Sequence, residues 1–540
     1  MIGDGYMKNM FKTMLVFVSL FMLTNVVLAK DPELTWTKYL EDANNAYHFI
    51  STDTYDSESY YVGGVKNTEE INIAYVSDIA DASNNGIVAK YDKDGNLLWK
   101  VIPDGVKLIY RVKSTSDGGV VALGENTTKP DGSDFMHSTL FKYDKDGKLV
   151  WKSELQTTTV YKSDIQDYSI NAEIFLGDNG SYVVVLGTDD VNIVVVGSDG
   201  TVNRNFNTAS LSDDNNDIRL TSYTKDSDNY IVLFGQKTIK NSDNFKLVMY
   251  KFDLNGYLVF DREIGDTTDY ITHSSLAINS DKNYVFANVV EDINFNKTFK
   301  FDIYDRSGKL LGSKSFVKVD GSSDFYDYLD FKLRIDLEGN YIVNYDGAGT
   351  IFSKKYDTNL NLIWEYDTEN HFYPSGFLVD KYNNYIYVGG VNQVSPQNAN
   401  NKNPIAIQPA IAMHNDINAG YISKYLTDYQ VNTVKEGVGE VESSASTATA
   451  GDTVTIKATP GEGYRIDKII VTDANGNNID VVDNKFIMPA SNVTIKVIFT
   501  NTPIDNPKTG TMDVIGALVI LALLGAASYQ YIKSKDMISL

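Results

Sequence analysis

A short stretch that the chain contains twice decides the fold: GIVAKYDKDGNLLWKV at Gly86–Val101 and LFKYDKDGKLVWK at Leu140–Lys152. Each copy is an apolar strand, a Tyr-Asp-Lys-Asp-Gly turn and a second strand that carries a Trp. Asp-Gly is a favoured hairpin dipeptide because glycine takes a positive φ without strain. An EF-hand loop is disfavoured because the residues after Gly95 are apolar and strand-like rather than ligating. The stretch therefore indicates a hairpin turn rather than a metal loop or a catalytic acid pair.

The hairpin recurs along the chain, and its spacing indicates the architecture. Counted by the position of the tyrosine, the copies lie 52 to 56 residues apart, with one final gap of 69, at Tyr91, Tyr143, Val196, Phe252, Tyr304, Tyr356 and Tyr425. Each hairpin follows an apolar strand that ends in Gly or a small residue. A period near 50 with period-two alternation is typical of propeller blades. Residues 30–428 are therefore predicted to form an all-β, seven-bladed β-propeller.

Trp36 indicates how the ring closes. Trp99, Trp151 and Trp364 each lie in the strand after a hairpin turn, whereas Trp36 in LTWTKYL has no hairpin before it. The chain is thus expected to enter in the middle of a blade, on an outermost strand. Propellers close without open edges by pairing strands from both ends of the chain. Residues 34–40 are predicted to complete the last blade beside GYISKYL at 420–426.

These residues resemble a known repeat family. STSDGGVVALGE at 114–125, followed by the second hairpin, resembles the bacterial surface β-propeller repeat T-S-D-G-G-Y-I-V-x-G … K-Y-D-x-x-G-N-x-x-W, and the resemblance covers residues 34–428. The expected shape also resembles quinoprotein-type propellers, whose blades dock Trp between neighbours. The resemblance implies an extracellular scaffold and does not imply one activity.

Both ends of the chain resemble export and anchoring signals. Residues 1–29 have Lys8 and Lys12 before an apolar run and resemble a secretory signal peptide, with an uncleaved membrane anchor as the alternative. Residues 502–513 form a linker that is followed by an apolar span at 514–532 and a basic tail at 533–540, as a membrane-spanning segment with a cytoplasmic end requires. The linker resembles the sorting signal of sortase-anchored Gram-positive surface proteins through Asn506, Pro507, Lys508, Thr509 and Gly510.

The sorting resemblance implies two partners and a location. A sortase would cleave between Thr509 and Gly510 and join Thr509 to peptidoglycan, so the protein would be membrane-tethered before sorting and wall-anchored afterwards. A plain membrane-tethered protein is the alternative. The first position of the pentapeptide is Asn506 where the family has Leu, which leaves the sortase class open.

A second, smaller β-rich domain is predicted at residues 429–501. Short alternating strands are separated there by Gly-Asp, Pro-Gly and Asn-Gly turns. AGDTVTIKATPGEGY, FIMP and NVTIKVIF resemble the divergent internalin-type B repeat of bacterial surface proteins. That resemblance implies a spacer between the propeller and the anchor.

Composition excludes several functions. The 540 residues include no Cys, which excludes disulfides, zinc-thiolate sites and Cys nucleophiles, and a net charge of −23 disfavours nucleic acid as a partner. Metalloprotease, serine-hydrolase, phosphate-loop and dinucleotide motifs are absent from the sequence. No catalytic residue is assigned, although a pair of carboxylates for glycoside chemistry remains an alternative among so many acidic residues.

An acidic motif recurs before the innermost strand of several blades, as in SDIQDY at 163–168. Loops at this position of consecutive blades lie around one mouth of a propeller channel, so their carboxylates form a candidate ring for Ca²⁺ or a cationic ligand. The candidate residues are Asp164, Asp167, Asp213, Asp217, Asp266, Asp269, Asp324 and Asp327. The alternative, which the sequence favours, is that each Asp accepts hydrogen bonds from backbone amides of its own turn. His48 and His273 are weaker ligand candidates, since a lone His beside an aromatic residue is more often structural.

The sequence therefore predicts a monomeric, wall-anchored surface protein whose propeller binds a glycan, a matrix protein or another extracellular ligand. The alternative is a surface enzyme that acts on polysaccharide through carboxylates at the propeller mouth. A purely structural role is the third interpretation. The fold by itself does not name a ligand.

Overall fold

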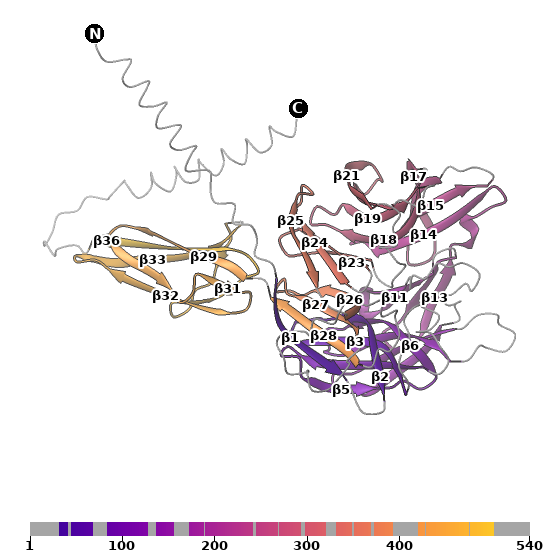
Figure 1. Cartoon of the computed structure of the whole chain (residues 1–540), viewed down its shortest axis with the longest axis horizontal. Coiled ribbons are helices and arrows are strands. Elements are labelled where there is room, and N and C mark those ends of the chain that lie inside the picture. Colours follow the sequence, from indigo (N-terminus) through magenta and orange to yellow (C-terminus); the bar gives the residue numbers. More distant parts are fainter. Residues whose placement is uncertain are drawn as a thin grey trace, which may run out of the picture.

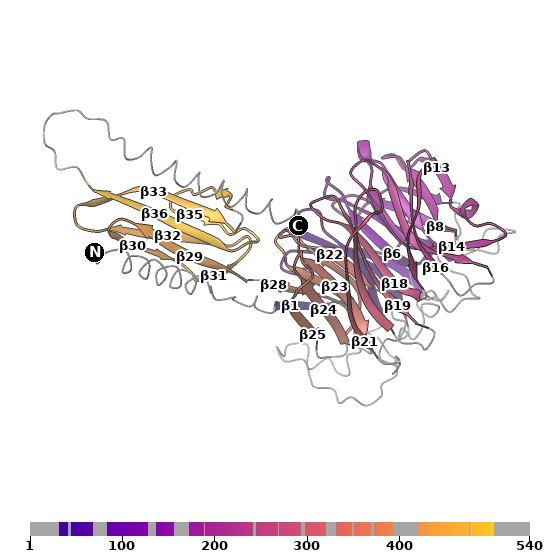
Figure 2. The same ribbon diagram turned by 90° about the horizontal axis from the view of Figure 1, so that it is seen from above.

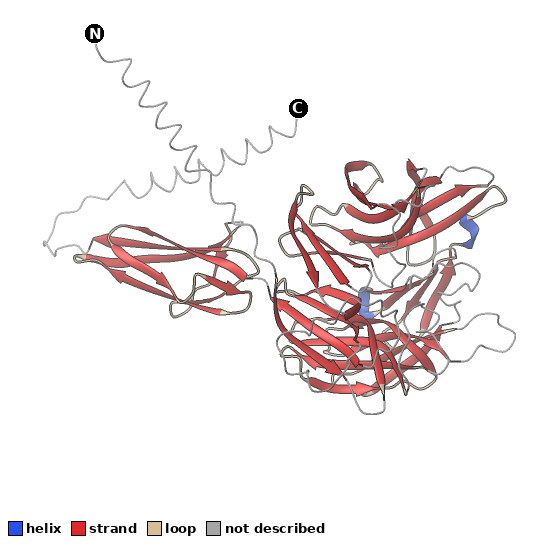
Figure 3. Cartoon of the chain, in the orientation of Figure 1, coloured by secondary structure: helices blue, strands red, loops and turns tan. Residues whose placement is uncertain are grey.

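The chain is almost entirely β-structure. The computed structural model describes residues 32–40, 45–68, 84–127, 137–155, 172–187, 190–240, 245–267, 269–292, 297–319, 331–347, 350–368, 372–391, 419–426, 428–474 and 476–501. Within these ranges the only helical segments are two short 3₁₀ turns, η1 (Asp178–Gly180) and η2 (Ala209–Leu211) (Figure 3). The predicted all-β class is confirmed.

Most of the described strands form four-stranded antiparallel sheets, in which strand order follows chain order. The first three of these sheets are β2 (Ala46–Asp53), β3 (Ser59–Asn67), β4 (Asn85–Asp92), β5 (Leu97–Val101); β6 (Val106–Ser114), β7 (Val120–Asn126), β8 (Ser138–Tyr143), β9 (Leu149–Leu155); and β10 (Ala172–Leu176), β11 (Tyr182–Leu186), β12 (Asn192–Val196), β13 (Val202–Asn207). The next three are β14 (Asn216–Lys225), β15 (Ile231–Ile239), β16 (Phe245–Phe252), β17 (Leu258–Thr267); β18 (Tyr270–Ile278), β19 (Tyr284–Glu291), β20 (Lys297–Tyr304), β21 (Leu310–Val319); and β22 (Lys332–Ile335), β23 (Tyr341–Gly347), β24 (Thr350–Tyr356), β25 (Leu362–Thr368).

One further four-stranded sheet joins the two ends of this region. Its order is β1-β28-β27-β26, with β26 (Phe372–Val379), β27 (Tyr385–Val391), β28 (Ala419–Leu426) and β1 (Glu33–Leu40). Thr37 of β1 lies opposite Ser423 of β28, and their hydroxyl oxygens are 2.8 Å apart. The predicted pairing of residues 34–40 with 420–426 is therefore present.

In each four-stranded sheet one edge strand lies toward a common centre, as in a β-propeller (Figures 1 and 2). These innermost strands are β2, β6, β10, β14, β18, β22 and β26. Strand β2 contacts β6, the first strand of the next sheet, and also β26, the first strand of the last sheet. In the middle strands β8, β11, β12 and β27 every side chain is buried, as in the run Val183–Leu186 of β11. Both faces of these strands therefore pack against neighbouring sheets.

The conspicuous aspartates of the repeated turn are structural. The Asp92 carboxylate accepts hydrogen bonds from the backbone amides of Asp94 and Asn96 at 3.0 and 2.7 Å, and Gly95 closes the turn with a φ of +80°. The first aspartate of later copies accepts the same pair of amides, at Asp144, Asp253, Asp305 and Asp357. Each turn is thus held by its own Asp, which favours the hairpin interpretation.

The tryptophans of the repeat explain why the turn ends in glycine. A Trp on the outermost strand of one sheet covers the turn glycine of the next sheet, so that a Cβ on that glycine would lie only 2.8 to 2.9 Å from the indole ring. The pairs are Trp36 on Gly95, Trp99 on Gly147 and Trp151 on Gly200. Trp36 on β1 makes this contact with the first complete sheet, so the last sheet docks on the first as the others dock on their neighbours.

Two smaller sheets follow the last four-stranded sheet. One has the order β31-β29-β36-β33-β34 and the other β30-β32-β35. Their strands are β29 (Asp428–Glu436), β30 (Gly439–Ser443), β31 (Thr447–Thr449), β32 (Thr453–Pro460), β33 (Tyr464–Asp473), β34 (Asn478–Ile479), β35 (Lys485–Ile487) and β36 (Val493–Asn501). They share one core that includes Phe486, Ile495 and Phe499, against which Tyr382 of the preceding region packs.

Candidate functional site

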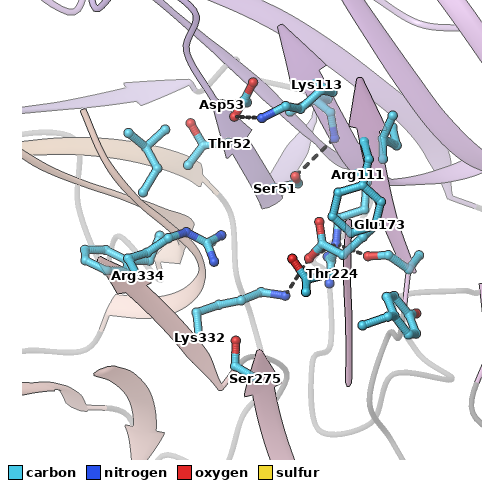
Figure 4. A pocket seen from close by; sticks show the side chains of 18 of the residues that line it. Ser51, Thr52, Asp53, Arg111, Lys113, Glu173, Thr224, Ser275, Lys332 and Arg334 are labelled. Carbon is cyan, nitrogen blue, oxygen red and sulfur yellow. Dashed lines mark hydrogen bonds and ion pairs between the residues drawn. The ribbon is translucent and has the colours of Figure 1, made fainter. Parts of the chain in front are cut away.

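The innermost strands surround a central cavity of about 600 Å³ (Figure 4). Its lining comes from β2, β6, β10, β14, β18, β22 and β26, or from residues directly after them. Each four-stranded sheet in the described chain therefore contributes its first strand. A cavity of this volume is within the range of small-molecule sites.

The charge of the lining is opposite to that of the protein. Five cationic side chains face two carboxylates in the cavity, whereas the whole chain carries −23. The cations are Arg111, Lys113, Lys225, Lys332 and Arg334, and the carboxylates are Asp53 and Glu173. Such a local surplus of positive charge attracts anions and repels cations.

Glu173 is the carboxylate at the centre of this cluster. Its Oε1 lies 3.6 Å from Nε of Arg111 and 3.4 Å from Nζ of Lys332. Burial opposes its ionisation, but Lys332, Arg111 and Arg334 outweigh that effect and lower the pKa of Glu173 to about 2. Glu173 is therefore an anion near neutral pH and is poorly suited to act as a general acid.

Hydrogen bonds hold the other charged side chains of β2 and β6 against the wall of the cavity. Arg111 donates from Nε to the Ala172 carbonyl at 2.6 Å and from Nη1 to the Tyr110 carbonyl at 2.8 Å. Asp53 accepts from Lys113 Nζ at 3.0 Å and from the Ser114 amide at 2.7 Å. All of these contacts except the one to Tyr110 join neighbouring sheets, and together they position the charges.

Hydroxyl groups make up much of the remaining polar lining. Ser51 and Ser275 each accept a backbone amide of the next sheet, from Val112 and Leu333 at 3.1 and 3.0 Å. The buried Thr52 Oγ1 and the Tyr223 hydroxyl have no hydrogen-bond partner in the described chain. The serine and threonine residues that line the cavity are Ser51, Thr52, Thr54, Thr221, Ser222, Thr224, Ser274 and Ser275.

The predicted acidic ring falls only partly within the described residues. Asp164, Asp167, Asp324 and Asp327 lie outside them. Asp213 accepts the amides of Asn215 and Asn216 at 2.7 and 2.8 Å, as the turn-capping alternative expects.

The other described members of the predicted ring have lysine partners. Asp217 lies 3.3 Å from Lys240 Nζ, Asp269 lies 3.6 Å from Lys300 Nζ, and Asp266 pairs with Lys246. Asp266 and Asp269 also line a separate surface cavity of about 660 Å³ together with Lys246 and Lys300. No group of three His, Asp or Glu side chains in the described ranges is arranged to hold a metal ion. Calcium binding by the full set of eight stays a prediction.

The two candidate histidines are in different surroundings. His48 is fully buried, and its Nε2 lies 2.8 Å from the Ser375 hydroxyl. Nδ1 of His273 lies 3.1 Å from the hydroxyl of the neighbouring Thr272. Neither residue lines the central cavity.

Burial lowers the pKa of His48 to about 3, so the ring stays neutral in the folded protein where the unfolded chain would protonate it. Stability from this source is therefore complete above pH 6.5 and is lost as the pH falls toward 3, by about 1.4 kcal/mol per pH unit. Between pH 6.5 and pH 4.5, His48→Gln should lose about 2 to 3 kcal/mol less than the wild type in denaturant unfolding. His137→Gln, at a histidine with 20% side-chain exposure, controls for loss of a ring. Equal losses of unfolding free energy in the wild type and His48→Gln over this pH range would contradict a buried, neutral His48.

The predicted signal peptide, sorting pentapeptide and apolar span lie outside the described residues. Across the ranges that the structure does describe, no helix has the length and apolar character to cross a membrane.

The cavity cluster was not identified from the sequence. Arg111, Glu173 and Lys332 lie on three strands that are far apart along the chain, and each by itself looks like an ordinary polar position of an alternating strand. A usable signal was present in RVK at 111–113 and KLR at 332–334, where two cations two residues apart point to the same face of an innermost strand.

Solved structures that are similar to the chain have low sequence identity to it. A catalytically inactive virginiamycin B lyase from Staphylococcus aureus, with quinupristin, matches at 12% identity and a TM-score of 0.41 over 72% of this chain and 99% of its own. The periplasmic gluconolactonase of Pseudomonas aeruginosa matches at 13% identity and a TM-score of 0.37 over 65% of this chain and 92% of its own. Drosophila plexin A in complex with semaphorin 1b matches at 7% identity and a TM-score of 0.37, over 74% of this chain and 88% of its own. Similarity at this level does not assign an activity.

No curated protein sequence matches the chain. A family comparison gives a result for the two smaller sheets, where residues 429–503 match the divergent InlB B-repeat domain. The resemblance to the divergent internalin-type B repeat that was inferred from the sequence is thereby confirmed for this part of the chain.

Proposed function

We propose that the seven four-stranded sheets are the blades of one closed propeller, and that this propeller binds an extracellular ligand in its central cavity. The observation that carries the proposal is the cavity itself, which is lined by the first strand of every such sheet in the described chain. Ring closure by β1 gives the cavity a continuous wall, and its polar lining suits specific recognition.

The setting of this ligand binding is the surface of a Gram-positive bacterium. The leader at 1–29 and the sorting pentapeptide Asn506–Gly510 with its apolar span support export and sortase-catalysed attachment to peptidoglycan. The B-repeat domain, in line with the resemblance, holds the propeller away from the wall. The protein is proposed to act as a monomer, in line with the sequence-based expectation.

Binding is favoured over polysaccharide hydrolysis by the state of the cavity carboxylates. A glycosidase needs one carboxylic acid that stays protonated beside a second that is ionised. Of the two carboxylates in the cavity, Glu173 has a lowered pKa and Asp53 pairs with Lys113. Both therefore stabilise neighbouring cations, and neither has the surroundings of a proton donor.

The proposal is tested by probing a glycan and matrix-protein array with the full chain. Wild-type protein is expected to bind a restricted set of spots. Thr224→Trp places a bulky ring in the cavity and should remove that binding without changing the melting temperature by more than a few degrees. Wild-type protein that bound no spot, or spots that Thr224→Trp bound equally well, would refute ligand capture in the cavity.

A further inference from the structure

We propose that the cavity recognises an acidic sugar, whose carboxylate is held by Arg334 and Lys332 and whose hydroxyls face the Ser and Thr lining. This inference rests on the proposed ligand capture and adds the chemical class of the ligand. It is carried by the arrangement of charges and hydroxyls in the cavity.

The positive charge in the cavity is not balanced by its own carboxylates. Asp53 pairs with Lys113, and Glu173 is shared by Arg111 and Lys332. Among the described residues, no carboxylate lies within ion-pair distance of Arg334 or Lys225, although both line the cavity. An anionic group on a ligand would supply the missing countercharge in a partly enclosed space, where such a pair is stronger than at an open surface.

Arg334 is placed to make that contact. Its guanidinium donates from Nη1 to the Leu333 carbonyl at 3.0 Å, and it extends into the cavity beside Lys332 (Figure 4). A guanidinium has five N–H donors in a planar fork that matches the two oxygens of a carboxylate. The contact to Leu333 therefore leaves donors for a ligand while it restrains the side chain.

The rest of the lining fits a sugar better than a small inorganic anion. Phosphate alone would fill only a small part of about 600 Å³, whereas one or two sugar rings occupy such a volume. The Ser and Thr side chains of the lining, such as Thr224 and Ser275, offer hydrogen bonds to ligand hydroxyls. Phe175 and Phe377 add apolar ring surface to the same wall.

Isothermal titration of the full chain with galacturonate and glucuronate, against galactose and glucose, tests this assignment. A uronate is expected to bind and its neutral counterpart to bind at least tenfold more weakly, because the neutral sugar lacks the charge-assisted contact. Raising the salt from about 50 to about 500 mM should weaken uronate binding, as it does for partly exposed charge pairs.

Two matched variants test whether uronate binding depends on Arg334. Arg334→Gln should lower uronate affinity at least tenfold. Arg204→Gln should leave it unchanged, because Arg204 also donates to the carbonyl of its preceding residue, Asn203, at 2.8 Å, but lies exposed on β13 outside the cavity.

The contrary outcomes separate this inference from the proposed function. Equal uronate binding by the wild type and Arg334→Gln, or tighter binding of inorganic phosphate than of either uronate, would overturn the acidic-sugar assignment. Array ligands that bind the wild type but not Thr224→Trp, and that uronates do not displace from the wild type, would also overturn the acidic-sugar assignment. That result would leave the proposed ligand capture in place. An array without any Thr224→Trp-sensitive ligand would instead refute ligand capture.

Discussion

Lys355→Met is expected to lower the free energy of unfolding by about 3 to 5 kcal/mol, since it leaves a buried carboxylate without its cation. Lys355 is 3% exposed, and its Nζ lies 2.7 Å from Oδ2 of the fully buried Asp336. Asp336 also accepts the amides of Glu338 and Asn340 at 2.9 and 2.8 Å, which hold the turn between β22 and β23. Denaturant unfolding of the variant measures the loss.

A double variant separates the charge effect from the loss of packing. Lys355→Met with Asp336→Asn should recover part of the loss, because the amide oxygen still accepts the turn amides and the fully buried carboxylate is gone. The recovery is only partial because Glu338, 3.6 Å from Lys355 Nζ, also loses its cation. Lys457→Met is the exposed control, where the pair with Glu442 at 2.8 Å has side chains 72% and 59% exposed. Its expected cost is much smaller than that at Lys355, because exposed ion pairs contribute little to stability. A cost at Lys355 no larger than at Lys457 would contradict the buried-pair account.

Trp36→Ala is expected to cost about 3 kcal/mol, the lower end of the range for removal of a buried aromatic side chain, because Trp36 is only partly buried. Its ring packs edge-on against Tyr60 at 6.5 Å and covers Gly95, both in the first complete sheet. The variant therefore weakens the contact that holds the last sheet to the first. The midpoint of denaturant unfolding measures the effect.

Leu34→Ala is the matched control on the same strand, because Leu34 is 42% exposed and its removal should change stability by no more than about 0.5 kcal/mol. Gly95→Ala should be destabilising like Trp36→Ala, since the added Cβ meets the indole at 2.9 Å and the φ of +80° disfavours any side chain. Equal stability of Trp36→Ala and Leu34→Ala would show that β1 does not close the ring.

The sequence predicted the four-stranded sheets and the pairing of β1 with β28 because the relevant signals are local and repeated. Alternating strands and turns recur mostly 52 to 56 residues apart, three of the hairpins are followed by a Trp, and Trp36 without a hairpin marks the unmatched strand. The indole of Trp99 covers Gly147 in the hairpin turn of the next sheet. This contact gives a physical reason for the repeat, because the turn is the surface on which the previous sheet packs.

The sequence did not predict the charged lining of the central cavity, because that lining depends on contacts between distant residues. Arg111 and Lys332 meet Glu173 only because β6, β22 and β10 line one cavity, which no local pattern predicts. The acidic loops attracted attention because they repeat, but Asp217 and Asp266 pair with Lys240 and Lys246, two lysines that the repeat does not mark.

An engineered disulfide tests whether the N-terminal strand closes the ring of sheets around the cavity. The chain has no cysteine, so Thr37→Cys with Ser423→Cys introduces a single pair, at paired positions of β1 and β28 whose side-chain oxygens are 2.8 Å apart. An intramolecular disulfide is expected in the folded protein, seen by mass spectrometry and as a reductant-sensitive rise in melting temperature. Free thiols in the folded double variant, or cross-linking no better than for Thr37→Cys with Ser198→Cys in another sheet, would contradict it.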